Sequence, residues 1–85
     1  MDRMNLVARS LEDRILSMQV DISFQLLKRW GIVPIRFVEL DAKYGILEFI
    51  RISYEPFHLT GDEGIMDEIE EFISEQGGVI KLYHV

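Results

Sequence analysis

The sequence predicts an α+β fold, in which an antiparallel sheet carries helices on one face. Leu16–Leu26 alternates apolar and polar residues, which is the period of a half-buried strand. Residues 35–54 hold two further apolar runs joined by a glycine-ended loop, a pattern typical of a hairpin. Residues 60–78 instead repeat apolar residues at helical spacing. The order strand, helix, strand, strand, helix, strand is the split βαβ order of ferredoxin-like domains.

The first third of the chain leaves two interpretations open. Residues 2–12 fit either a helical stripe or the start of a strand. The alternation places a strand near Arg14–Asp21, whereas Ser23–Trp30 holds strong helix formers and ends in two cations before Gly31. Because the alternation continues to Leu26, the boundary between strand and helix stays open. If no helix forms there, the alternative fold is a three-stranded meander followed by one helix and a final strand.

The middle of the chain predicts two paired strands. Pro34 suits the start or the edge of a strand. The strands are Ile35–Leu40 and Ile46–Tyr54, joined by the loop Asp41–Gly45. Because Ile46–Tyr54 is apolar on both faces, we expect it to be central or covered on both sides.

The last third predicts a loop, a helix and a strand. Glu55–Gly61 is the loop, and Thr60–Gln76 is the helix. Thr60 with Glu63 forms a capping-box pattern, and the glycines after Gln76 supply a left-handed stop. Val79–Val85 is the expected final strand.

Length and composition describe one domain, residues 1–85, with a net charge of −6. The chain has no cysteine, which excludes disulfides and thiolate metal sites. No apolar run approaches the ~20 residues of a membrane span, and the N-terminus is too charged for a signal peptide, so we expect a cytoplasmic protein. The acidic balance predicts no binding to nucleic acid or to anionic membranes.

The helix over residues 60–76 carries an outward acidic face without Lys or Arg. Its members are Asp67, Glu68, Glu70, Glu71 and Glu75. Like charges three and four residues apart repel, which indicates a solvated face or a surface that a basic partner neutralises. The preceding loop offers Phe57 and His58 as recognition anchors, although we favour the interpretation in which Phe57 and Leu59 fold back onto the core. The predicted partner-binding residues are Phe57, His58, Glu68, Glu70, Glu71 and Glu75.

A hard cation such as Ca²⁺ is the second candidate ligand, because it prefers oxygen donors from flexible loops. The carboxylates that the predicted fold places for it are Glu39, Asp41, Asp62, Glu63 and Asp67. The EF-hand pattern is absent. No cofactor is otherwise required.

The acidic run from Asp62-Glu63-Gly64 into Asp67–Glu71 resembles that of small uncharacterised archaeal α+β families. Some of their members are associated with calcium through acidic surface residues. The resemblance covers the second half of the chain and implies a calcium-binding surface there.

No catalytic motif is present: the chain has no paired His and Cys, no G-x-S-x-G, no H-E-x-x-H and no P-loop. We therefore expect a non-enzymatic interaction or regulatory domain. Its contact surface would be the acidic helix face and the loop before it, and the edge of the sheet would offer a route to self-association. Weak Ca²⁺ binding is the alternative function.

Overall fold

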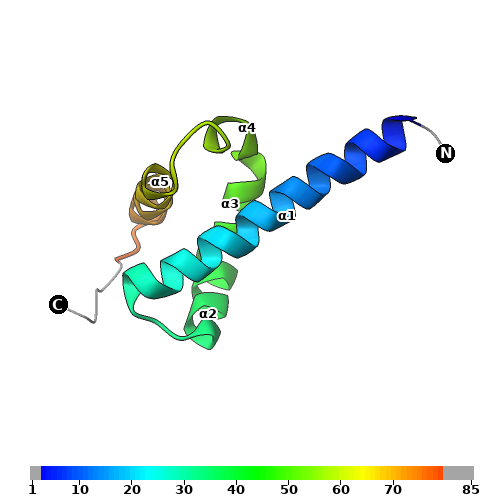
Figure 1. Ribbon diagram of the computed structural model, residues 1–85. Helices are drawn as coiled ribbons and strands as arrows, with labels where there is room; N and C mark the ends of the chain where they lie inside the picture. Colours follow the sequence, from blue (N-terminus) through cyan, green and yellow to red (C-terminus); the bar gives the residue numbers. More distant parts are fainter. Residues whose placement is uncertain (1–2, 80–85) are drawn as a thin grey trace.

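The computed structural model describes the backbone of residues 3–79 and the side chains of residues 10–79. This part of the chain holds five helices and no strand (Figure 1): α1 (Arg3–Trp30), α2 (Pro34–Tyr44), α3 (Ile46–Ile52), α4 (Tyr54–Phe57) and α5 (Asp62–Glu75). The predicted α+β fold is therefore wrong, both in its ferredoxin-like order and in its meander alternative. The predicted final strand lies outside the described residues except for Val79. None of the described helices is long and apolar enough to cross a membrane.

α1 replaces both the predicted strand near Arg14–Asp21 and the short helix Ser23–Trp30. The helix ends where predicted, because Gly31 adopts a left-handed φ of 65°. The alternation misled because every second residue also belongs to a series with a spacing of four. Residues four apart lie on one side of a helix, so an alternating run forms two apolar stripes on opposite sides of α1.

α2 and α3 replace the predicted hairpin. Pro34 occupies the start of α2, where its missing N–H has no helical partner to lose. The expected loop Asp41–Gly45 is the last turn of α2 followed by Gly45, whose left-handed φ of 72° separates the two helices. Each helix buries only two side chains, so its helical period is hard to recognise. Packing against the core overrides the strand preference of the β-branched and aromatic residues.

α5 confirms the predicted helix over residues 60–76, and Gly77 confirms its left-handed stop with a φ of 84°. The capping box does not form. The helix begins after Gly61 without a side-chain cap, and the Thr60 hydroxyl donates instead to the Pro56 carbonyl at 2.9 Å. The predicted loop before α5 contains the short helix α4.

One apolar core holds the helices together. α1 contributes Ile22, Leu26 and Trp30, and the other helices surround them with Phe37, Leu40, Ile46, Ile50, Phe57, Ile65, Met66, Ile69 and Ile73. Only the C-terminal half of α1 lies in this body. The N-terminal half projects beyond the other helices, which makes the molecule 51 Å long and only 23 Å by 21 Å across (Figure 1).

A candidate protein-interaction groove on the outer face of α1

α1 carries two apolar stripes, and they meet different surroundings. The inner stripe is Met18, Ile22 and Leu26, of which Ile22 and Leu26 are 1% and 0% exposed. The outer stripe is Leu16, Val20 and Phe24, which are 58%, 43% and 61% exposed. The two stripes repeat the same spacing of four residues. The inner stripe therefore builds the core, and the outer stripe lies on the surface.

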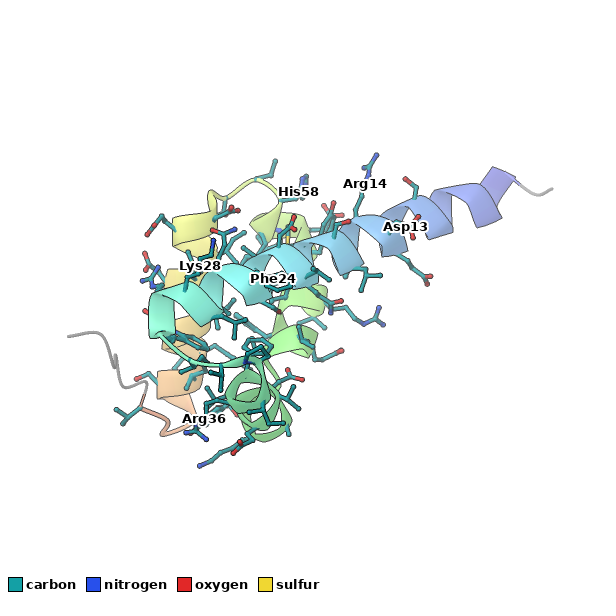
Figure 2. All side chains as sticks on the ribbon, turned by 60° about the horizontal axis from the view of Figure 1, so that its bottom comes forward. Asp13, Arg14, Phe24, Lys28, Arg36 and His58 are labelled. Atoms are coloured by element: carbon teal, nitrogen blue, oxygen red, sulfur yellow. The ribbon has the colours of Figure 1, made fainter. Side chains whose placement is uncertain are left out.

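The outer stripe forms one wall of an open groove of about 410 Å³. The groove is lined by Leu16, Gln19, Val20, Ser23, Phe24 and Leu27 of α1, by Pro34, Phe37 and Val38 of α2, and by Leu47 of α3. Figure 2 shows Phe24 in the C-terminal half of α1, between Asp13 on the projecting half and Lys28 near the end of the helix. The groove thus runs beside α1 where the long helix meets α2 and α3.

Among the described residues that line this groove, none has an ionisable side chain. Its two polar side chains already donate hydrogen bonds within the molecule: Gln19 Nε2 to the Leu47 carbonyl at 2.9 Å, and Ser23 Oγ to the Gln19 carbonyl at 2.6 Å. Val38 adds a further exposed apolar side chain. Contact between water and a contiguous apolar surface is unfavourable, so this groove is a candidate for contact with another apolar surface.

Near the end of α1, the inner side also makes polar contacts that hold the helix to α5. Arg29 donates through Nη2 to Asp67, lies with Nε 3.1 Å from Glu70 Oε2, and lies with Nη1 3.5 Å from Glu63 Oε2. Trp30 Nε1 donates to the same Glu70 carboxylate at 2.8 Å. The hydrogen bond that Arg29 donates to Asp67, together with the charges of Glu70 and Asp67, raises the pKa of Arg29 above its ordinary value against the opposing effect of its partial burial. We call Glu63, Asp67 and Glu70 the inner acidic row of α5, and all three contact Arg29 within the molecule.

The structure does not bring the predicted cation ligands together. They were Glu39, Asp41, Asp62, Glu63 and Asp67. Glu39 lies 3.5 Å from Arg36, Asp41 accepts the Leu47 N–H at 2.8 Å, and Asp62 accepts the Gln25 side-chain amide at 2.7 Å. Glu63 and Asp67 contact Arg29. Within residues 10–79, no group of three or more His, Asp or Glu side chains is placed to hold a metal ion.

The predicted partner-binding residues separate into buried and exposed groups. Phe57 is in the core, where its ring meets Phe49 edge to face at 5.6 Å. His58 is on the surface, stacked on Tyr54 and 3.5 Å from Glu55. The outer acidic row of α5 is Glu68, Glu71 and Glu75, all exposed and without an ion pair to any residue that the structure describes.

Sequence reasoning missed the groove, although the signal for it was present. If residues 16–26 form a helix, their alternation gives two apolar sides, and a helix needs only one side for its core. The second apolar side of a long helix was thus the observation that indicated an outward contact surface.

Comparison with known proteins identifies one family. The model of a family described as "Protein of unknown function (DUF3791)" matches residues 24–76, which is more than half of the chain. The match begins within α1, at Phe24, and includes the residues of α2 and α3 that line the groove. No curated protein and no solved structure matches the chain.

Proposed function

The chain belongs to the DUF3791 family of proteins of unknown function, and we propose that it acts as a non-enzymatic protein-interaction domain. Its ligand is the apolar face of a helix, which lies in the groove between α1, α2 and α3. The observation that supports this proposal is the outer stripe of α1. Its three large apolar side chains are exposed to water, whereas the other apolar side of the same helix packs in the core.

The chemistry of the groove favours a helix over a polar ligand. An amphipathic helix in a groove is anchored by apolar side chains spaced three and four residues apart. The groove offers apolar walls from three helices and has no charged group to orient a small polar molecule. Its Gln19 and Ser23 side chains already donate within the chain, so an apolar ligand would not leave these donors unpaired.

This proposal moves the contact surface away from the acidic face of α5. Asp67 and Glu70 of that face, together with Glu63, lie against Arg29, so these carboxylates already have a partner within the molecule. Glu68, Glu71 and Glu75 add negative charge on the other side of the molecule, which favours solubility.

The proposal is tested with a photoactivatable cross-linking residue at Val38, inside the groove, in cells that make the protein at its natural level. Ile52 is the matched control position, because it is an exposed apolar residue on α3 outside the groove. We expect a defined protein cross-linked from position 38 and not from position 52. That protein, once purified, should bind the wild-type domain at least about 10-fold more tightly than it binds the Phe24→Lys variant.

The control variant Ile52→Lys should bind the same protein as tightly as the wild type does. Identical cross-linking from both positions, or equal affinity of the Phe24→Lys variant, would show that the groove is not the contact surface.

A further inference from the structure

The outer face of α1 has a symmetric spacing. Its central residues are Leu16, Val20, Ser23 and Leu27, separated by four, three and four residues. At about 100° per residue, all four lie within a narrow sector of the helix. The series reads the same in both directions, so a second α1 running antiparallel places Leu16 against Leu27 and Val20 against Ser23.

We infer that the helix that fills the groove is α1 of a second copy of this chain, and this inference rests on the proposed function. The two copies are related by a twofold axis that passes between residues 21 and 22 of each α1. Such an interface is isologous: each contact from one copy to the other occurs twice. The spacing of four and three residues is also the spacing by which packed helices interlock their side chains.

Small residues at the centre of the stripe permit close approach of the two helices. Val20 and Ser23 are the residues nearest the axis, and the larger Leu16 and Leu27 lie at the two ends. The Ser23 hydroxyl donates to its own helix at 2.6 Å, so it does not need a partner in the second copy. Phe24 lies on one edge of the stripe, where it covers the partner helix.

The exposed apolar area on the outer face of α1 is similar to the apolar area that each partner buries in a standard dimer interface. Leu16, Val20, Phe24 and Val38 are between 43% and 61% exposed, which corresponds to on the order of 400 Å² of apolar surface. A standard interface covers about 800 Å² on each partner, and slightly more than half of that area is apolar. The outer face therefore supplies the apolar area that one side of such an interface needs.

The charges at the ends of the stripe are complementary in the antiparallel arrangement. Asp13 and Lys28 are both exposed, and neither forms an ion pair with another described residue. At about 100° per residue, both lie on the same flank of the stripe. Around the proposed axis, Asp13 of one copy lies close to Lys28 of the other, and this pairing occurs twice. The acidic helix α5 stays far from the axis, because Arg29, which binds it, lies nine residues and thus half a turn around α1 from Val20.

The projecting half of α1 also acquires a contact in this arrangement. Residues 10–13 of one copy lie opposite residues 30–33 of the other, at the start of the partner's α2. The half of α1 that extends beyond its own body in Figure 1 thus extends along the body of its partner.

Sedimentation of the full chain from about 1 µM to about 1 mM tests the inference. We expect a monomer–dimer equilibrium in the wild type. Val20→Asp should weaken dimerisation by at least about 100-fold, because it places a carboxylate beside its own symmetry mate in an apolar site. Phe24→Lys is the second groove variant, and Ile52→Asp is the control that should dimerise like the wild type. Circular dichroism and thermal melting confirm that each variant is folded.

Charge exchange tests the antiparallel register. Asp13→Lys and Lys28→Asp should each weaken the dimer by about 3- to 10-fold, and the variant carrying both should return to within about 3-fold of the wild type. A wild type that is monomeric at every concentration overturns the inference, as does a dimer that survives both groove substitutions. Failure of the double exchange to restore dimerisation rejects the proposed register. A monomeric wild type that still cross-links another protein from position 38 would leave the proposed function standing and reject only the second copy as the occupant.

Discussion

The two sides of α1 use the same spacing of apolar residues for different purposes. On the inner side, Ile22 and Leu26 are buried against the other helices, and Arg29 and Trp30 continue that side with polar bonds to α5. On the outer side, Val20 and Phe24 reach water beside the groove. Apolar character alone therefore does not define a core. What decides burial is whether the chain supplies a second element to cover the stripe.

The difference also separates stability from binding. The inner side stabilises the monomer, since its side chains lose contact with water when the chain folds. The outer side gains this stabilisation only when another helix covers it. Substitutions on the inner side should consequently change the free energy of unfolding, whereas substitutions on the outer side should mainly change binding. Four predictions test this difference, and the largest expected effect comes first.

The largest effect is expected from a matched truncation on the two stripes. Leu26→Ala should lower the free energy of unfolding by about 2–5 kcal/mol, because it leaves a cavity in a fully buried site. Phe24→Ala removes a larger side chain from a site that is 61% exposed, and it should change that free energy by less than about 1 kcal/mol. Urea unfolding measures both, and repeating it at two protein concentrations separates the stability of the monomer from any contribution of dimerisation. Equal losses would mean that the outer stripe belongs to the core.

The second effect tests how closely the core is packed where Tyr44, at the end of α2, meets Ile73 and Gly78 at the end of α5. A Cβ at Gly78 would lie 2.6 Å from a methyl group of Ile73 and 2.7 Å from the ring of Tyr44. Ile73 is fully buried, so a shift of its methyl group would disturb its neighbours in the core, and Gly78→Ala should cost about 1–3 kcal/mol of stability. Gly61→Ala is the control, because a Cβ there meets no atom within 4 Å. If the Gly78 variant were as stable as this control, the contact between Gly78, Ile73 and Tyr44 would not be closely packed.

The third effect concerns the charged link between α1 and α5. Arg29→Met keeps much of the apolar stem and removes the cation, leaving three carboxylates without it. We expect a loss of about 1 kcal/mol in thermal or urea unfolding, reduced by added salt because the group is partly exposed. Arg36→Met is the control: its only carboxylate partner within residues 10–79 is the exposed Glu39, at 3.5 Å, so the loss should be about 0.5 kcal/mol or less.

The pH dependence of the Arg29 effect has a definite sign. Folding raises the pKa of Arg29, so its contribution is fully present below its ordinary pKa and is lost only when the pH rises through the higher folded value. The difference between wild type and Arg29→Met should thus stay constant from about pH 7 to about pH 10. A difference that disappears within that interval would show that a group other than the guanidinium controls the link.

The two apolar sides of α1 also explain why this helix could not be predicted from the sequence. The helix α5 was predictable because it has one apolar stripe, a glycine stop and a polar outer face. α1 was not, because its second stripe converts a helical period into an alternation, and no feature of the chain between residues 14 and 26 separates the two readings. The prediction failed at α2 and α3 for another reason. Both helices are short, and their strand-forming residues adopt helical structure because of their packing against the core.

The candidate site was obscured in the same way. The sequence drew attention to the acidic residues of α5, whose charge is conspicuous in composition. Arg29 and Trp30 contact some of these carboxylates, among them Asp67 and Glu70, and these contacts join residues about forty positions apart, which no local sequence pattern indicates. The groove requires α2 and α3 to lie beside α1, which depends on the whole fold.

The smallest effect distinguishes the two acidic rows of α5. Asp67→Asn removes a carboxylate bonded to Arg29 and should destabilise the domain by about 0.5–1 kcal/mol. Glu71→Gln removes an exposed carboxylate that faces like charges at Glu68 and Glu75, so it should stabilise the helix by about 0.2–0.5 kcal/mol. Each substitution removes one negative charge from the same helix, so their opposite signs report position and not net charge. Unfolding in urea at low salt, repeated at high salt, should show the two effects shrinking together; the same sign for both would mean that the Arg29 contact does not distinguish the rows.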